Sequence, residues 1–440
     1  MNALSSQPYK GTRDYSPDDK RVQNYIFSTW KSAVAKFGYV EYMTPLLEPL
    51  DIYTAKSGQE LATEQTYAFT DRGGRNVAIR PEMTPSVSRL VASRRQEWPV
   101  PLRLFSVANF MRYERPQRGR EREFWQLNVD LFGVEGVAAE AEVISMSYEM
   151  LKTFGASDDM FVIKINNRKL INFIMANYFG LDVAQAQAMI RLLDRKNKID
   201  ASVFADQAKD IFGELDAEAG MIKLQSILSA NNMADLPTEI KNTSAVEEVK
   251  DLFAILDRLG VTNAVFDITL MRGLDYYSGM VFEVFDTDPE NNRSLFGGGR
   301  YDGLVGLFGV EPMSAVGFAP GLSTMELFLE SHNLIPAHAT AQSVTAYVVS
   351  VGDNMTNALI VAATIRKAGF DAEVDITERK LDKRIKTASN KNIPYVVFVG
   401  DDEVKEQVFT VRNLQTGEQA KIAPDAFGSF FASNSTNQPS

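Results

Sequence analysis

The sequence has no cysteine and only two histidines, and these shortages exclude several kinds of chemistry. Without cysteine the chain cannot form a disulfide, a thiolate nucleophile, or a zinc or iron–sulfur site with thiolate ligands. His332 and His338 lie six residues apart in a loop-like stretch, which argues against a Ser-His-Asp triad and against a metal site built from several histidines. We therefore expect no resident metal site. Any reaction must use Arg, Lys, Asp, Glu, Gln or Tyr side chains, backbone groups, or a metal ion that arrives with a substrate.

Long apolar runs and an excess of positive charge are also missing. No stretch approaches the roughly 18 apolar residues of a membrane span, and the N-terminal MNALSSQPYKG has no signal-peptide core. We therefore expect a cytoplasmic protein with no membrane partner. The 46 basic and 57 acidic residues give a net charge of −11, which argues against a polycation that coats nucleic acid. With 440 residues, 45% of them hydrophobic, the chain is expected to form two or three globular domains.

Local signals in the first part of the chain predict a helix and then a strand. Ser16, Pro17 and two aspartates are typical of a helix start, and Gly38 is typical of a helix end. A strand is expected over 39–46.

Residues from about 165 to 260 change character and are expected to be mostly helical. The part of that segment from 201 to 260 carries five basic and eleven acidic residues, which is more than half of the net charge.

A long hairpin is predicted between these regions, with arms at 102–113 and 122–132. On its second arm apolar residues alternate with polar ones. Because side chains of a strand point alternately to its two faces, Gln126 and Asp130 should share one face of the sheet.

The C-terminal part alternates between strand and helix patterns, which favours a compact α/β domain. Further strands are expected before it at 266–269 and 280–285, and a helix after Gly321. The expected strands of the C-terminal part are 344–351, 371–375 and 394–399, and its expected helices are 355–369 and 379–391.

Arginine occurs in three notable stretches, of which the first is Arg-Pro-Glu-Met-Thr-Pro at 80–85. One interpretation is a strand that turns into a helix capped by Thr84, with the charged groups in solvent. The other is a binding site, and the local pattern leaves both open.

The second stretch, 112–122, connects the arms of the hairpin and carries five arginines and two glutamates. Hairpin loops are often charged for solubility alone. Five arginines without a lysine favour a function, because the planar guanidinium binds phosphate oxygens in pairs and stacks on bases.

The third stretch, 271–277, reads Met-Arg-Gly-Leu-Asp-Tyr-Tyr and is followed by Gly-Gly-Gly-Arg-Tyr-Asp-Gly at 297–303. Three consecutive glycines permit close approach of a ligand or a neighbouring strand, and a tight turn is the alternative. No P-loop or G-x-G-x-x-G fingerprint follows a strand, so those two nucleotide sites are not indicated.

Together these stretches resemble the histidyl-tRNA synthetase family of class II aminoacyl-tRNA synthetases. The resemblance runs from Gly-Thr-Arg-Asp at 11–14 to the C-terminal domain. The segment ending near Pro45 resembles motif 1, which forms the dimer interface in the family. The hairpin resembles motif 2, with Arg112 at the position of its invariant arginine. Residues 272–277 and 299–303 resemble two signatures that are peculiar to the histidine enzymes, and these make the match specific.

The resemblance implies an α+β catalytic core with a mixed, mainly antiparallel sheet, a helical insertion and a C-terminal α/β anticodon-binding domain. In chain order we expect a core with motifs 1 and 2 (1–165), a mostly helical insertion (166–260), the rest of the core (261–330), a linker (331–343), the anticodon-binding domain (344–432) and a disordered tail (433–440).

The implied activity is the joining of L-histidine to tRNA(His) by a homodimer that uses ATP, with Mg²⁺ held mainly by the phosphates. Arg112 and Arg272 are the implied catalytic cations, on opposite sides of the α-phosphate. Glu114 and Arg120 are implied to hold the rest of ATP. The histidine pocket corresponds to Glu82, Thr84, Gln126, Asp130, Tyr277 and Tyr301.

The implied contacts to tRNA lie in two places. The first is the hairpin connection, at Arg115 and Gln117. The second is the window 376–391, which holds six basic and two acidic residues. Clustered basic residues in an anticodon-like domain are candidates for phosphate contacts. The expected residues there are Arg379, Lys380, Lys383 and Arg384.

The sequence departs from the family pattern at two places that matter for binding. Asp130 stands where glutamate is more common. In the stretch resembling motif 3, Ser323 and Thr324 stand where the family has Glu-Arg, so a cation for ATP is missing. Arg75 and Arg300 are candidates to replace it. Two alternative functions follow from such losses: a regulatory subunit of ATP phosphoribosyltransferase, or a non-catalytic paralogue that binds tRNA or histidine.

Overall fold

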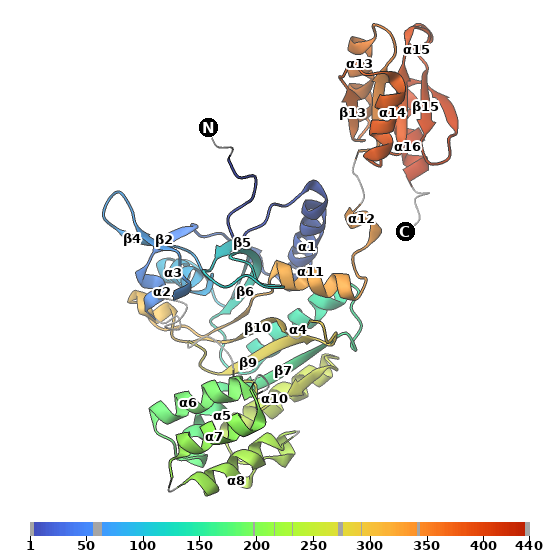
Figure 1. Ribbon diagram of the computed structural model, residues 1–440. Helices are drawn as coiled ribbons and strands as arrows, with labels where there is room; N and C mark the ends of the chain where they lie inside the picture. Colours follow the sequence, from blue (N-terminus) through green and yellow to red (C-terminus); the bar gives the residue numbers. More distant parts are fainter. Residues whose placement is uncertain are drawn as a thin grey trace. The chain divides into compact units, whose positions relative to one another are not determined.

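The computed structural model describes residues 4–55, 64–196, 199–214, 216–230, 232–271, 276–291, 293–340 and 344–435. The chain divides into two compact units, Met1–Ile335 and Pro336–Ser440 (Figure 1). The boundary falls within the segment 331–343, for which a linker was expected. Within it, α11 ends at Ser331 and a short helix, α12, spans Ala337–Thr340.

The N-terminal unit is built on an eight-stranded sheet of order β1-β5-β6-β11-β10-β9-β7-β8. The outermost pairs, β1 with β5 and β7 with β8, are parallel, and the pairs between them are antiparallel. The predicted mixed, mainly antiparallel sheet is therefore confirmed. The strands are β1 (Val40–Glu41), β5 (Leu102–Met111), β6 (Glu123–Phe132), β11 (Ala315–Phe318), β10 (Ser294–Arg300), β9 (Met280–Asp286), β7 (Phe161–Asn167) and β8 (Ala264–Phe266).

The predicted hairpin is confirmed as β5 and β6, which pair from Leu102 opposite Phe132 to Met111 opposite Glu123. The strand expected over 39–46 is shorter than predicted. It ends at Glu41, and the carbonyl of Thr44 accepts a hydrogen bond from the Arg80 side chain.

The strand expected at 266–269 lies earlier in the chain, at β8. It ends at Phe266 because the Asp267 carboxylate accepts hydrogen bonds from the backbone N–H and the hydroxyl of Thr269, which turns the chain.

One face of this sheet packs against four helices: α1 (Pro17–Ala35), α4 (Ala138–Thr153), α10 (Ser244–Arg258) and α11 (Leu322–Ser331). The predicted start of α1 is confirmed, since Ser16 accepts from the Asp19 N–H and the Asp19 carboxylate accepts from the Ser16 N–H. Leu127, Val129 and Leu131 of β6 belong to the large core between the sheet and these helices. The alternation on β6 therefore directs Gln126 and Asp130 to the opposite face, as predicted.

The opposite face carries a smaller layer with its own apolar cluster around Met83, Val87, Tyr276 and Tyr301. Thr84 was considered as a helix cap. It is instead the first residue of α3, after Met83, and makes no capping bond. The elements of this layer are the three-stranded sheet of β2 (Leu47–Pro49), β4 (Asn76–Ile79) and β3 (Ala68–Thr70), the helices α2 (Asp51–Thr54) and α3 (Thr84–Ser93), and a 3₁₀ turn (Val305–Phe308).

Between β7 and β8 the described residues form helices and no strand, around a separate apolar cluster (Figure 1). The later part of this region, residues 201–260, is the acidic segment of the chain. The elements before α10 are α5 (Arg168–Phe173), a π-helix (Ile174–Tyr178), α6 (Val183–Asp194), α7 (Ala201–Phe212), α8 (Ala217–Leu228), a 3₁₀ turn (Met233–Asp235) and α9 (Thr238–Lys241).

The C-terminal unit contains a five-stranded sheet of order β13-β12-β14-β15-β16. The three predicted strands and two predicted helices are confirmed as β12 (Ala346–Ser350), β13 (Ala372–Asp375), β14 (Tyr395–Val399), α13 (Met355–Lys367) and α14 (Leu381–Asn390). The elements not predicted are α15 (Asp401–Glu406), β15 (Phe409–Asn413), β16 (Gln419–Ile422), a 3₁₀ turn (Pro424–Ala426) and α16 (Phe427–Ser435).

A disordered tail was predicted for 433–440, and the predicted start at residue 433 lies too early in the chain. Residues 433–435 end α16, whose Phe427 and Phe431 side chains are fully buried in the core of the unit. Residues 436–440 lie outside the described part of the chain. Among the described helices, none has the length and apolar character needed to cross a membrane.

Candidate active site

A cavity of about 320 Å³ lies on the face of the large sheet opposite α1 and α4. Its wall contains all six residues expected for the histidine pocket, together with Arg112. These come from distant parts of the sequence: Glu82 and Thr84 at the start of α3, Gln126 and Asp130 on β6, and Tyr277 and Tyr301 beside β9 and β10. The fold therefore gathers this set in one chamber.

Asp130 lies at the buried end of the chamber and is only 4% exposed. The Tyr301 hydroxyl donates a hydrogen bond to its Oδ1 atom, while Oδ2 is buried and accepts no hydrogen bond from the described residues. Burial raises the pKa of the Asp130 carboxyl from 3.8 to about 7, although the nearby hydroxyls of Tyr301 and Tyr42 act in the opposite direction. Asp130 therefore contributes to the cavity wall a carboxylate with one oxygen that accepts no hydrogen bond within the described part of the chain.

Three carboxylates line the chamber, and one of them was not anticipated. Glu82 is buried and accepts a hydrogen bond of 2.9 Å from the Tyr276 hydroxyl. Glu283, on β9, also lines the wall. Burial, followed by the charges of Glu82, Glu283 and Asp130, raises the pKa of the Tyr277 hydroxyl, which therefore remains a donor. The one signal for Glu283 in the sequence was an isolated carboxylate within the apolar run Met-Val-Phe-Glu-Val-Phe.

Two glycines permit the close packing around these groups. A Cβ atom on Gly317 would lie 2.6 Å from Oδ1 of Asp130, and one on Gly299 would lie 3.0 Å from the ring of Tyr277. The glycine run was predicted to allow close approach of a ligand or a strand. Here the neighbours of Gly299 are the backbone of β9 and the Tyr277 ring.

A second cavity, of about 240 Å³, adjoins the first. Arg112, Gln126, Gly297 and Ala319 line both cavities and so mark the junction. The second cavity is also lined by Phe124 of β6 and by the first turn of α11. A ligand with two parts, one in each cavity, would be joined beside Arg112 and Gln126.

Arg112 is held so that its end faces the junction. Its Nε–H donates to the carbonyl of Pro81 at 2.8 Å, and its guanidinium lies over the Phe124 ring, 5.2 Å from the centroid. Within the described residues it makes no ion pair, and no hydrogen bond from its two terminal nitrogens. An oriented guanidinium without a counter-charge is suited to bind an anion.

The other residues of the hairpin connection that were predicted to bind ATP or tRNA do not lie together in one cavity. Glu114 and Arg120 form an ion pair of 2.8 Å on the wall of the second cavity. Arg115 lines a separate cavity of about 410 Å³ beside Lys10. Gln117 closes the tight turn with Arg120 through backbone hydrogen bonds. Arg272 lies outside the described residues.

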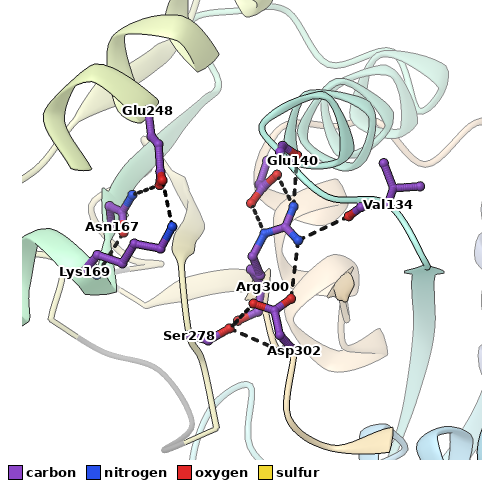
Figure 2. Close-up of polar contacts among 9 residues, drawn as sticks. Val134, Glu140, Asn167, Lys169, Glu248, Ser278, Arg300 and Asp302 are labelled. Atoms are coloured by element: carbon purple, nitrogen blue, oxygen red, sulfur yellow. Dashed lines mark hydrogen bonds and ion pairs between the residues drawn. The ribbon is translucent and has the colours of Figure 1, made fainter. Parts of the chain in front are cut away.

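Neither arginine considered as a substitute for the motif 3 arginine reaches these cavities, so that prediction is wrong. Arg300 points to α4, where it is buried and paired with both carboxylate oxygens of Glu140, at 2.6 and 2.7 Å (Figure 2). The carbonyls of Val134 and Gly136 and the carboxylate of Asp302 accept its other hydrogen bonds. Arg75 is 80% exposed and paired with Asp71 in the turn between β3 and β4.

In the C-terminal unit, Arg384 was wrongly assigned to tRNA binding. It is 7% exposed, donates to the carbonyl of Ser350 at 2.8 Å and lies 3.4 Å from the Asp375 carboxylate. Arg379 is exposed and loosely paired with Asp375 at 3.6 Å. Lys380 and Lys383 are exposed and form no ion pair within the described residues.

No group of three or more His, Cys, Asp or Glu side chains suitable for a metal ion occurs in the described ranges. His332 directly follows the last residue of α11 and lies 2.7 Å from the buried Asp286 carboxylate, which gives this histidine a structural partner.

Two family models match the chain: one described as histidyl-tRNA synthetase over residues 11–325, and one described as anticodon binding domain over residues 345–434. The histidine–tRNA ligase of Leptospira biflexa is 38% identical over 418 residues, 94% of this chain and 95% of the relative. That of Haloarcula marismortui is 34% identical, over 95% of this chain and 96% of the relative.

Solved structures share the fold. The histidyl-tRNA synthetase of Nostoc sp. superposes with a TM-score of 0.79 at 22% identity, covering 98% of this chain and all of that one. A Bacillus halodurans protein described as an ATP phosphoribosyltransferase regulatory subunit/histidyl-tRNA synthetase has a TM-score of 0.74 at 24% identity, over 91% and 99% of the two chains.

Proposed function

We propose that this chain, which belongs to the histidyl-tRNA synthetase family, is a histidine–tRNA ligase. The observation that supports this most strongly is the junction of two cavities at Arg112 and Gln126. One cavity is lined by three carboxylates and suits a cationic amino acid. The other adjoins an oriented guanidinium and suits a nucleotide.

The first cavity is proposed to bind L-histidine in one orientation. Its carboxylate must lie at the junction, because that is where it can meet ATP. The imidazole then lies at the buried end, where an N–H group can donate to the free Oδ2 of Asp130. Glu82, Thr84 and Gln126 are proposed to bind the ammonium group. A site whose buried polar atoms need partners discriminates strongly against ligands that lack them.

Adenylation then follows from positioning and charge. A carboxylate oxygen of histidine attacks the α-phosphorus of ATP, a new O–P bond forms, and the bond to pyrophosphate breaks. Arg112 is proposed to bind the α-phosphate and stabilise its developing charge, with Arg272 as a second cation. Glu114 and Arg120 are proposed to contact the rest of ATP. In the second step, the 3′-hydroxyl of tRNA(His) attacks the histidyl carbonyl and releases AMP.

Mg²⁺ is proposed to enter as part of the ATP substrate. The lining of the second cavity fits this proposal, because Glu114 is already paired with Arg120 and Glu121 lies 3.4 Å from Arg13. Ligands for the ion would therefore come mainly from the phosphates and water, as is common for magnesium bound with nucleotides.

The contacts to tRNA are proposed at two surfaces. In the N-terminal unit these are Arg115 and Gln117 of the hairpin connection. In the C-terminal unit, which matches the anticodon-binding family, they are the exposed Arg379, Lys380 and Lys383. The affinity should fall with salt concentration, because cations that neutralise phosphates release counterions.

A homodimer is proposed, with its interface near β1. This strand lies at the edge of the large sheet. The strand and the segment that follows it expose apolar side chains: Val40 is 58%, Met43 57% and Leu47 48% exposed. An exposed apolar segment beside an open strand edge is typical of an interaction surface. A cytoplasmic location is proposed because the tRNA partner is there.

The regulatory-subunit alternative is less supported. The curated relatives cited above are histidine–tRNA ligases over nearly their full length, and the C-terminal unit matches the anticodon binding domain.

The test is histidine-dependent exchange of labelled pyrophosphate into ATP. The ligase should catalyse exchange with L-histidine and not with glutamine or lysine, which cannot place an imidazole N–H beside Asp130. Absence of exchange at millimolar ATP would refute the proposal.

A further inference from the structure

A further cavity, of about 200 Å³ and called the third cavity below, adjoins the second cavity, which is proposed to bind ATP and is called the ATP cavity. The two share Gly119, Leu295 and Thr324 as wall residues. The third cavity is formed by the hairpin connection, the chain before β10 and the first turns of α11. It therefore extends the proposed nucleotide site away from the histidine chamber.

Thr324 leaves room for this cavity. Its hydroxyl donates to the backbone carbonyls of Leu295 at 2.7 Å and Gly321 at 3.0 Å, so the polar end is turned into the fold. Its methyl group faces Gly119, where a Cβ atom would lie 3.6 Å away. A small side chain with its hydroxyl occupied fills little of the space between the hairpin connection and α11.

Two arginines line the cavity beside Thr324. Arg118 donates a hydrogen bond of 3.4 Å to the Asn291 side chain, which is itself fixed by the buried Asp286 carboxylate at 2.8 Å. Arg293 is exposed. Among the described residues neither Arg118 nor Arg293 forms an ion pair, and the one carboxylate on the wall is that of Glu290.

The balance of basic and acidic wall residues differs between the ATP cavity and the third cavity. In the ATP cavity, the cations Arg112 and Arg120 are matched by Glu114 and Glu121, and Arg120 is already paired with Glu114. Among the described residues of this wall, the one guanidinium that is not paired with a carboxylate is that of Arg112. A triphosphate carries several negative charges, and arginines bind phosphate oxygens strongly when no carboxylate competes.

We propose that Arg118 and Arg293 bind the terminal phosphate of ATP in the cavity beside Thr324. This inference rests on the proposed ligase function and assigns two binding residues to it. Because both arginines would hold the outer phosphates, they would also hold pyrophosphate as it leaves. Neither arginine lines the histidine chamber, and the cavity beside Thr324 shares no wall residue with that chamber.

The two arginines should therefore affect nucleotide binding and leave histidine binding unchanged. A charge-assisted hydrogen bond contributes about 1.5 kcal/mol, so each substitution to alanine should raise the KM for ATP about tenfold. The KM for pyrophosphate in the reverse reaction should rise similarly. AMP lacks the outer phosphates, and its affinity should be the same in the variants and the wild type.

The experiment compares Arg118→Ala, Arg293→Ala and the double variant with Arg75→Ala, a control whose arginine lies in an exposed turn outside the three cavities. Histidine-dependent pyrophosphate exchange gives the KM values for ATP and histidine, and calorimetry gives the affinity for AMP. In the double variant, Thr324→Arg places a guanidinium beside the same cavity and should restore much of the ATP affinity.

The outcomes separate this inference from the ligase proposal. If the wild type shows no exchange, the proposed function fails. If the wild type is active but Arg118→Ala and Arg293→Ala keep the wild-type KM for ATP, this inference is wrong. Equal losses of ATP, AMP and histidine affinity, with no recovery by Thr324→Arg, would show a structural role for the arginines and would also overturn it.

Discussion

Replacing Asp130 with asparagine should stabilise the N-terminal unit more at pH 8 than at pH 5, relative to the wild type. The carboxyl is buried, and its pKa is raised from 3.8 to about 7 in the folded chain. Between these two pH values the folded state holds a proton that the unfolded state has released. The stability of the wild type therefore falls as pH rises through this window, and levels off above about pH 7.

The size of the effect follows from the same two pKa values. One pKa unit corresponds to about 1.4 kcal/mol, so the full cost of ionising Asp130 in the fold is about 4 kcal/mol. About 2.5 kcal/mol of this should appear between pH 5 and pH 8. A carboxamide has nearly the same shape and does not titrate, so the variant should lack this part of the pH dependence.

The assay is urea unfolding followed by tryptophan fluorescence. The three tryptophans, Trp30, Trp98 and Trp125, all belong to the N-terminal unit, so the signal reports on the part of the chain that contains Asp130. The exposed Asp257 provides the matched control, as Asp257→Asn. The reasoning is refuted if the difference in unfolding free energy between Asp130→Asn and wild type is the same at both pH values.

Four further predictions concern Arg112, Arg384, Lys383, and the buried pair of Arg300 and Glu140. Arg112→Lys keeps the charge but loses the paired geometry, so kcat for pyrophosphate exchange should fall about 10²–10³-fold with a smaller change in the KM for histidine; an equal change in both would contradict a role in the transition state. Arg384→Ala should destabilise the C-terminal unit by about 3 kcal/mol in urea unfolding followed by circular dichroism, because it removes the buried guanidinium that lies beside the Asp375 carboxylate and donates to the Ser350 carbonyl. Lys383→Ala should change that stability by less than about 0.5 kcal/mol while weakening tRNA charging, with pyrophosphate exchange intact; a loss of exchange would oppose the assignment. Arg300→Ala should destabilise the N-terminal unit by about 3 kcal/mol, and Glu140→Ala by a similar amount, since each leaves the other charge buried.

Local patterns in the sequence predicted much of the framework. Alternation along β6 depends on the geometry of a single strand, so it correctly assigned Gln126 and Asp130 to one face. The N-cap signals at Ser16 act within one turn of helix, and they correctly placed the start of α1. Features with such short-range causes can be predicted without knowledge of the fold.

The roles of individual arginines could not be predicted in this way, because they depend on partners far along the chain. Arg300 pairs with Glu140, which is 160 residues away, and Arg384 is buried against Ser350 and Asp375. Nothing in the residues next to these arginines separates a buried structural guanidinium from one that faces a ligand. For the same reason Glu283 was missed, since its part in the chamber follows from the pairing of β9 with β10.

The net charge of −11 likewise proved to be a poor guide to partners. The segment 201–260 carries eleven acidic and five basic residues. Other parts of the chain hold the exposed Lys380 and Lys383, and the cavity-lining Arg112 and Arg118, which form no ion pair within the described ranges. The distribution of charge over the fold, rather than its sum, is therefore what bears on the binding of ATP and tRNA.

The most direct test of the ligase function is the charging of tRNA(His) with labelled L-histidine by the intact chain, at millimolar ATP with Mg²⁺. We predict that histidine becomes esterified to the tRNA, that charging depends on ATP, and that tRNAs for other amino acids remain uncharged. Binding of histidine and ATP without any transfer of histidine to tRNA(His) would contradict the account and would favour a non-catalytic paralogue.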